Sequence, residues 1–579
     1  MSGSGAVHVT TQRRHYTGKD GRERVYETHL LRRSWREGGK VRNETVANLS
    51  KLPAETIELI RGSLAGERFI PAGQQAQVAR SLPHGHAAAV HAMARQLGFP
   101  ALLGPPGPGR DLAYALIVSR VLRPASKLST IAWWDDVTLG ADLSAAGAST
   151  DDVYAAMDWL VSRQDDIEKQ LARRHLRAGG IAMFDLSSSW VEGSRCGLAA
   201  YGYSRDGKRG KAQIEYGLLT DPDGRPVAVR VFAGNTGDPA TFPEAVDTVR
   251  GTFGLQHMIM VGDRGMITSA RIKDLREVEG MAWITCLRGP AIRKLIADGG
   301  PLQLSLFDEQ DLAEITSPDY PGERLIACRN PVLAAERARK RADLLAATED
   351  DLRKVAAQVS AGRLKDPGKI GLRAGRVLNK RKVAKHITLD IAEGSLSWQR
   401  DQDSIDAEAA TDGIYVIRTP VPEQTLDAAG TVAAYKGLSR LERDFRSIKA
   451  DDLDLRPIFH RLEDRVRAHV LICTLACYLT WHLRQAWAPL TYADEHPPAR
   501  ANPVAPARRS PSANAKAAAK TGPGNQALRS FRGLIDHLAT LTRDTIRIAG
   551  QPADKLTAAT PDQRRAFDLI GAPIPLTIK

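Results

Sequence analysis

The sequence contains few cysteines and no long apolar run. Five cysteines stand among 579 residues, and no two of them have the C-x-x-C spacing of a zinc ribbon. An odd number without that spacing predicts reduced thiols rather than a disulfide framework. The most apolar stretch runs from Val470 to about Leu483, between His469 and Arg484. It is too short to cross a bilayer, so we expect a buried helix and no membrane partner.

Two other signals are missing. The first residues, MSGSGAVHVTTQRRHY, contain no apolar segment of the kind found in signal peptides, which predicts a cytosolic protein. The glycine-rich and proline-rich loop LGPPGPGR at 103–110 lacks the G-K-[ST] element of a phosphate-binding loop. A nucleotide triphosphatase of that class is therefore not expected.

An excess of basic residues is what the sequence does contain. Lys and Arg number 81 against 67 Asp and Glu, which gives a formal charge of +14 and a pI near 9.5. Such an excess in a protein of ordinary hydrophobic content favours a polyanionic partner, most often DNA or RNA. A basic enzyme without a nucleic acid partner would have the same composition, so charge alone leaves both interpretations open.

The length predicts three or four domains. Residues 1–52 alternate apolar and charged positions around glycine-containing turns, which indicates a small β-rich region. Its first 50 residues contain ten Lys and Arg against five Asp and Glu. This region is a candidate DNA-binding arm, although a solvated sheet face would show the same pattern. Residues 53–178 have apolar spacings of three and four, which predict a helical region.

Residues 179–290 alternate strand and helix signals, which predicts a mixed sheet with helices on its faces. Later segments differ in character. They are predicted as an inserted subdomain with a long charged helix at 291–425, a helical second part of the core at 426–490, a flexible basic linker at 491–525 and a C-terminal helical tail at 526–579.

Two aspartates follow apolar runs in the first part of this core. Asp185 ends the run IAMFD, and Asp263 ends MIMVGD. Such runs are typical of central strands, whose carboxyl ends face the crevice where ligands bind in α/β sheets. Two adjacent strands of this kind would bring two carboxylates together on a hard divalent cation. Either aspartate alone is more often a turn or helix cap.

A third carboxylate lies in a predicted helix with the sequence YKGLSRLERDFRSIKADDL. Leu438, Leu441, Phe445 and Ile448 are spaced three, four and three residues apart, which makes a core-facing stripe. Tyr435, Glu442 and Lys449 are seven residues apart, so on one continuous helix they share a second stripe. A glutamate there suits metal binding, with Lys449 and the nearby Arg446 holding phosphates. A surface glutamate in ordinary ion pairs is the alternative.

These residues resemble the insertion-sequence DDE transposases that have the signature Y-x2-R-x3-E-x6-K. Tyr435, Glu442 and Lys449 occupy the Tyr, Glu and Lys positions, whereas Leu438 stands where the signature has Arg. The resemblance extends over roughly 180–485. It includes the segments 202–242, GDRGM at 262–266 and RPIFHRLEDRVRAHVLICTLACYL at 456–479, which follow one another in the order seen in that family.

The resemblance implies an α/β fold with an RNase H-like, retroviral-integrase-like catalytic core. The first Asp would lie on the first strand, the second after the fourth strand, and the Glu on a late helix beyond a largely β insertion. Asp185, Asp263 and Glu442 would then hold two Mg²⁺ or Mn²⁺ ions. Such ions lie about 3.5–4 Å apart and together catalyse phosphoryl transfer on DNA. The implied partner is double-stranded DNA, bound by a homodimer on paired ends, in the bacterial cytosol and on the nucleoid.

The residues predicted to contact DNA are the remaining site candidates. Trp398 could stack on an unpaired base, although a packing role is commoner. Arg264 follows the second aspartate and could contact DNA or pair with a carboxylate. The full set is Tyr435, Lys449, Arg446, Arg264, Lys208, Arg209, Lys211 and Trp398.

The function predicted from the sequence is therefore a DNA transposase that cuts at terminal inverted repeats and joins the freed 3′-OH to target DNA. Two alternatives remain at this point. An RNase H-like nuclease would hydrolyse DNA without joining it, and a catalytically inactive descendant would bind DNA only. The basic ends and the long insertion disfavour the nuclease, and retention of all three carboxylates gives no support to the inactive descendant.

Overall fold

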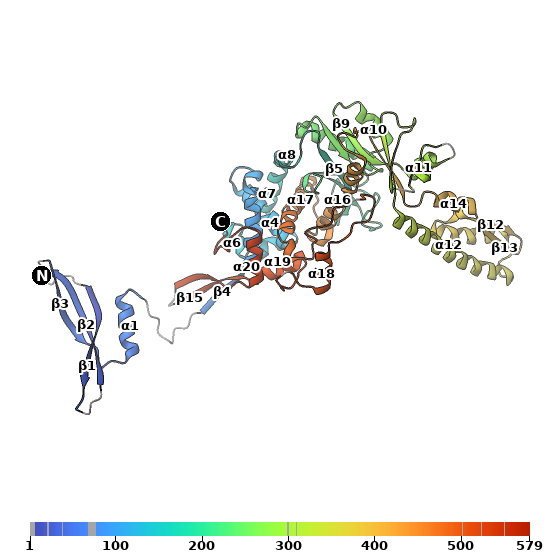
Figure 1. Cartoon of the computed structure of the whole chain (residues 1–579). Coiled ribbons are helices and arrows are strands. Elements are labelled where there is room, and N and C mark those ends of the chain that lie inside the picture. The colour runs from blue at the N-terminus through green and yellow to red at the C-terminus, as the bar shows by residue number, and fades with distance from the viewer. Residues whose placement is uncertain are drawn as a thin grey trace. The chain divides into compact units, whose positions relative to one another are not determined.

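The computed structural model describes residues 6–19, 23–37, 39–67, 77–297, 300–307, 310–500, 502–522, 524–548 and 551–578 (Figure 1). The chain divides into two compact units. One contains Met1–Ser81 and Arg543–Leu556, and the other contains Leu82–Thr542 and Thr557–Lys579. The first unit thus combines the N-terminal region with a segment close to the C-terminus.

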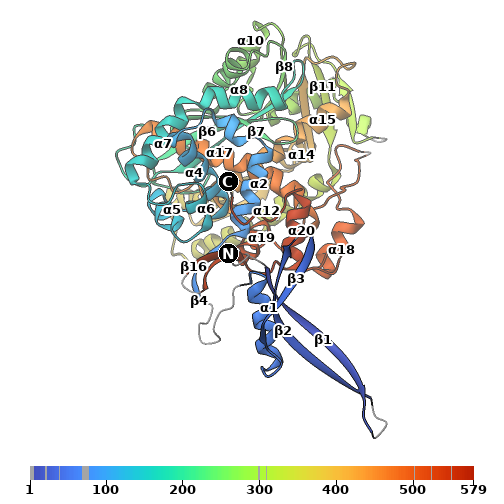
Figure 2. The same cartoon turned by 90° about the vertical axis from the view of Figure 1, so that its left-hand side faces the viewer.

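Three long antiparallel strands and one helix open the chain. They are β1 (Ala6–Thr17), β2 (Glu23–Glu37), β3 (Lys40–Asn48) and α1 (Ala54–Leu64), with β2 in the middle of the sheet. The strands occupy the segment whose alternating pattern predicts a β-rich region. Helix α1 packs against β1 (Figure 2), where Arg61 Nη2 donates to the Thr11 hydroxyl at 3.2 Å.

A second small sheet joins distant parts of the chain. Its strand order is β16 (Gln551–Leu556), β15 (Thr542–Ile548) and β4 (Gln77–Pro83). The sequence interpretation expected a helical tail over 526–579, but helix α19 (Phe531–Ala539) stops early and is followed by β15. That expectation was wrong because TRDTIRI, at 542–548, is rich in β-branched residues that alternate with charged ones, as strands prefer.

Helices dominate the next part of the chain. They are α2 (Gly85–Gln96), α3 (Phe99–Leu103), α4 (Pro108–Leu122), α5 (Lys127–Trp134), α6 (Thr138–Asp142), α7 (Thr150–Ser162) and α8 (Gln164–His175). Helix α7 begins with a capping box between Ser149 and Asp152. This region corresponds to the predicted helical segment.

The apolar stretch near Val470 lies in the long helix α17 (Glu463–Ala486). It packs against α4 and α7 (Figure 2). Within the described residues it is the one helix long and apolar enough to cross a membrane, but 83% of its apolar window is buried inside the protein. It is therefore a core helix, longer than the predicted apolar stretch.

An eight-stranded mixed sheet forms the catalytic core region. Its order is β10-β11-β14-β9-β8-β5-β6-β7. Strands β5, β8 and β9 are parallel, β6 runs antiparallel to β5, and the edge strand β7 runs antiparallel to β6. The strands are β5 (Ile181–Trp190), β6 (Gln213–Thr220), β7 (Pro226–Ala233), β8 (Met258–Val261), β9 (Met281–Cys286), β10 (Leu312–Ile315), β11 (Arg324–Arg329) and β14 (Ile414–Thr419).

The predicted insertion is largely helical where the resemblance implied a largely β one. Strands β10, β11 and β14 do not form a separate sheet, because they extend the central one. The rest packs around a small apolar cluster that includes Leu345, Leu352 and Leu378. It consists of α12 (Pro331–Ser360), α13 (Pro367–Arg381), the hairpin β12 (Ile387–Ala392) and β13 (Ser395–Arg400), and α14 (Gln402–Ala409) (Figure 1).

The segment expected to be a flexible linker contains an ordered helix. Ser510 is the N-cap of helix α18 (Pro511–Ala519), and its hydroxyl accepts a hydrogen bond from the Ala513 N–H. Serine at the cap, proline next and alanines after it are a helix start, which outweighs the basic, proline-rich composition. Val504 is fully buried nearby, so the segment packs on the core. The remaining helices are α9 (Asp238–Asp247), α10 (Ser269–Arg276), α11 (Gly289–Ile296), α15 (Ala428–Lys436), α16 (Leu438–Arg446) and α20 (Pro561–Leu569).

Candidate active site

The register of two parallel strands aligns the two aspartates. In the β5–β8 pairing, Met183 lies opposite Val261. Continuing this register by two residues along each chain brings Asp185 to the level of Asp263. The sequence interpretation placed Asp185 at the end of its strand, whereas β5 continues to Trp190. Strand β8 ends at Val261, so Asp185 faces the space that opens beyond the shorter strand.

Backbone amides hold the Asp263 side chain in place. Its Oδ1 accepts hydrogen bonds from the N–H groups of Gly265 at 2.9 Å and Met266 at 2.8 Å. A Cβ on Gly265 would lie 3.2 and 3.3 Å from the two carboxylate oxygens of Asp263. Glycine therefore allows the loop after β8 to fold closely around this carboxylate, which explains the GDRGM segment.

Glu442 is presented by helix α16, which packs against β5. Leu441 and Phe445 are buried, and the Phe445 ring meets Tyr216 of β6 edge-on, with ring centroids 5.7 Å apart. At the helix start, a Cβ on Gly437 would lie 2.9 Å from the sulfur of Met183. The apolar stripe predicted from the sequence thus anchors the helix and leaves the Glu442 side chain exposed.

The three carboxylates are close enough to influence one another. Burial raises the pKa of Asp185 to about 7, and the negative charges of Asp263 and Glu442 add to that rise. The hydrogen bond that Asp185 accepts from the Leu186 N–H opposes it. In the described part of the chain, none of the three carboxylates forms a salt bridge. They therefore form an acidic cluster at one edge of β5 and β8.

Arg205 lies close enough to this cluster to act on Asp185. It hydrogen-bonds the Asp238 carboxylate at 2.5 Å and also pairs with Glu215, and its charge lowers the pKa of Asp185. Burial raises the pKa of Glu215 to about 7, and Arg205 opposes that rise. Arg205 is absent from the site candidates predicted from the sequence. Its carboxylate partners lie 10 and 33 residues away, so no local pattern could reveal the network.

The predicted stripe of Tyr435, Glu442 and Lys449 does not exist as such. Helix α15 ends at Lys436, α16 begins at Leu438, and a π-helical turn (Ser447–Asp451) follows α16. A π turn has more residues per turn than an α-helix, so it rotates Lys449 away from the line of Glu442. Lys449 is buried and donates to Asp206 Oδ1 at 2.8 Å, and Arg456 pairs with the same carboxylate.

The other basic candidates near the core differ in their surroundings. Arg446 is exposed on α16, without an ion pair among the described residues. Lys208 lies over the Trp190 ring, 5.1 Å from its centroid, and Lys211 donates to Glu192 at 2.8 Å. Arg209 is exposed on the same turn. Of these four residues, Arg446 and Arg209 therefore remain available to contact a phosphate.

Trp398 lies on β13, away from the carboxylates in sequence and in packing. Its half-buried side chain packs on the apolar cluster of the insertion, the alternative that sequence reasoning left open. A role in stacking on a base finds no support in this packing.

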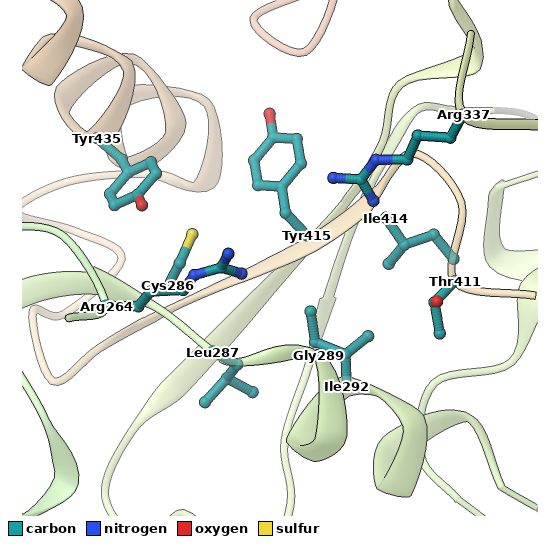
Figure 3. A pocket seen from close by; sticks show the side chains of 10 residues that line it. All are labelled: Arg264, Cys286, Leu287, Gly289, Ile292, Arg337, Thr411, Ile414, Tyr415 and Tyr435. Carbon is teal, nitrogen blue, oxygen red and sulfur yellow. The ribbon is translucent and has the colours of Figure 1, made fainter. Parts of the chain in front are cut away.

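A cavity of about 180 Å³ lies beside the loop that carries Asp263 (Figure 3). Arg264, Tyr435 and Tyr415 project into it together with Arg337 of α12. Burial raises the pKa of the Cys286 thiol to about 12, and the Tyr435 hydroxyl, which hydrogen-bonds that thiol, opposes the rise. Tyr435 and Arg264 therefore line the same cavity, although the helical stripe that suggested Tyr435 is not present.

Comparison with known proteins identifies the family. A family model described as "Transposase DDE domain" matches residues 189–479, just over half of the chain. The chain belongs to the DDE transposase family. A second model, "IS1634 family transposase, N-terminal domain", matches residues 14–76 of the transposase. Asp263 and Glu442 lie inside the first match, and Asp185 precedes it by four residues. The family predicted from the sequence is confirmed, and with it an RNase H-like α/β core.

Other comparisons add little to the family match. One similar solved structure is a cryo-EM structure of a piggyBac transposase synaptic complex with hairpin DNA. Its matching chain is 10% identical in sequence to this chain. The match covers 79% of this chain and 76% of that one, with a TM-score of 0.32. The description of the fold therefore depends on the sheet topology itself. No curated protein sequence matches the chain.

The donor set suits a divalent metal. A DDE transposase is a metal-dependent DNA endonuclease and strand transferase. Hard divalent ions prefer carboxylate oxygens, and the three acidic side chains lack cationic partners of their own among the described residues. Across those residues, no three His, Cys, Asp or Glu side chains are already gathered tightly enough to hold one ion. The three carboxylates therefore lie too far apart in this structure to hold one ion between them.

Proposed function

We propose that the transposase cuts DNA at the terminal inverted repeats of its element and joins the freed 3′-OH to target DNA, with Asp185, Asp263 and Glu442 holding two Mg²⁺ or Mn²⁺ ions. The observation that carries this proposal is the placement of three carboxylates on β5, the loop after β8 and α16, close enough that Asp263 and Glu442 both raise the pKa of Asp185. Structural carboxylates normally acquire a cationic partner or lie apart, because uncompensated charge is costly when partly buried.

Each residue near the site has a distinct part in this proposal. Two metal ions would activate the attacking oxygen and stabilise the leaving oxygen of the phosphodiester. Asp185, whose pKa both other carboxylates raise, would be held in common by the two ions, and Glu442 would complete the second site. Arg446 and Arg264, both exposed, contact the phosphates beside the scissile bond.

Lys449 has a positioning role rather than a phosphate contact. Together with Arg456 it holds Asp206, the residue that follows Arg205. Arg205 in turn links Glu215 and Asp238 behind the three carboxylates. Lys449 therefore fixes the loop that brings a cation next to Asp185.

The assembly and its location follow from the same proposal. Joining two element ends requires two active sites at once, which a homodimer on paired DNA ends supplies. The expected location is the bacterial cytosol, with association to the nucleoid when DNA is bound.

Incubation of the purified protein with a duplex that carries its flanking inverted repeat tests this function. With Mg²⁺ or Mn²⁺, we expect a nick at the repeat end and joining of a pre-cut 3′-OH end to a target plasmid. EDTA should abolish both products, and a duplex with a scrambled repeat should yield neither. Cutting without joining of the pre-cut end would instead support the alternative, a nuclease that does not transpose.

A further inference from the structure

The N-terminal sheet has two chemically different faces. Side chains alternate between the faces of a strand, so the antiparallel register separates even-numbered from odd-numbered residues of β1 and β2. Arg14 lies opposite Tyr26, and Arg13 lies opposite Glu27. In β3, the bulge near Leu31 places Asn43 opposite Ser34 of the even-numbered set. We call the side with the even-numbered residues of β1 and β2 the even face, and the other side the odd face.

The odd face is charge-balanced and packs against helix α1. All four acidic residues of strands β1–β3 lie on it. The Arg13 guanidinium pairs with Glu27 at 2.6 Å, and Arg42 pairs with Glu37 at 3.4 Å. Helix α1 contacts this side, since Arg61 reaches Thr11. The acidic residues are Glu23, Glu27, Glu37 and Glu44.

The even face has the opposite character. Within the strand residues 6–17, 23–37 and 40–48 it contains no acidic residue. Neither Arg14 nor Arg36 has a carboxylate partner in the described part of the chain, and both are exposed. Tyr16 and Tyr26 are 55% and 54% exposed. His8, Arg24 and Arg32 also lie on this face, and hydroxyl and amide side chains fill its other polar positions, namely Thr10, Gln12, Thr28, Ser34, Asn43, Thr45 and Asn48.

We propose that the even face is the surface with which the transposase binds the duplex at its element ends. Uncompensated arginines match the phosphate backbone, and flanking amide and hydroxyl groups are the side chains that read base edges. Beyond the reach of β3, residues 12–17 and 23–28 form a two-stranded β-ribbon, a shape that fits the major groove, which is about 12 Å wide. A protein partner fits less well, because this face offers arginines and polar groups instead of a contiguous apolar patch. This inference rests on the proposed function, since it takes end DNA as the ligand.

Two matched double variants of the full-length protein test the inference. Arg14→Gln/Arg36→Gln removes two exposed positive charges from the even face. Arg13→Gln/Arg42→Gln removes two from the odd face, where the side chains are 70% and 63% exposed. Both variants lose the same net charge, so a difference between them reports the face and not the overall electrostatic attraction.

Affinity for a fluorescent inverted-repeat duplex is measured by anisotropy, with EDTA present, over a range of salt concentrations. For the even-face variant we expect at least about a 10-fold loss of affinity and a salt slope smaller by about 2, since each lost phosphate contact lowers that slope by about 1. The odd-face variant should bind within about 3-fold of the wild type, on the scale of a substitution away from the contact. Circular dichroism confirms that each variant is folded.

Equal losses for the two faces, or a larger loss for the odd face, would overturn the inference. So would an equal loss of affinity for a single strand of the same sequence, since the proposal concerns the duplex. Because EDTA excludes metal chemistry, the result does not depend on the carboxylates. Normal binding by the even-face variant would refute this inference alone, whereas a wild-type protein that neither cuts nor joins would refute the proposed function.

Discussion

Replacement of Asp185, Asp263 or Glu442 by alanine is expected to abolish cutting of end DNA while leaving its binding largely intact. Each substitution removes a metal ligand, and none removes a cation that contacts phosphate. A loss of at least about 10³-fold in cutting rate is expected, the scale on which removal of a single preorganised electrostatic group acts. The rate is measured with a labelled inverted-repeat duplex and excess enzyme, and binding is measured on the same duplex.

A carboxylate elsewhere in the core provides the control. Glu277, which follows α10, is exposed and has no ion pair among the described residues, so Glu277→Ala should cut at the wild-type rate. Wild-type cutting by the Glu442→Ala variant would show that α16 does not supply the third ligand. Loss of DNA binding by all three variants would instead indicate that the carboxylates maintain the fold.

Gly437→Ala is expected to slow cutting by about 10²-fold, because a displacement near 1 Å in a catalytic group has an effect of that size. The added methyl group would lie 2.9 Å from the Met183 sulfur and 2.8 Å from the Ala434 carbonyl oxygen. To relieve these contacts, helix α16 must move away from β5 and carry Glu442 with it. Single-turnover cutting measures the effect.

The matched control is Gly375→Ala in helix α13, where an added Cβ has no neighbour within 4 Å. This variant should cut normally and gain slightly in stability, since alanine favours a helix over glycine by about 1 kcal/mol. Unchanged cutting by Gly437→Ala would mean that the contact between α16 and β5 does not determine where Glu442 lies.

Short-range patterns predicted the core well. Apolar runs located β5 and β8, and spacings of three and four located the buried side of α16. These patterns are local consequences of burying one face of an element, so they are visible in the sequence. The alignment of Asp185 with Asp263 required only the further assumption that two parallel strands are neighbours.

Features that depend on distant partners or on breaks in regular structure were missed. The π turn after Arg446 reorients Lys449, and nothing in the spacing of Tyr435, Glu442 and Lys449 signals it. Arg205 finds its partners through tertiary folding. Composition was also misleading, because the segment around Ser510 looks like a linker but packs on the core.

Binding of Mn²⁺ to the transposase on end DNA tests the central claim most directly, with free Mn²⁺ followed by electron paramagnetic resonance. The account predicts two tightly bound ions per subunit in the wild type and fewer in Asp185→Ala, with Glu277→Ala unchanged. The same Mn²⁺ occupancy in wild type and Asp185→Ala would contradict a metal site built on these carboxylates.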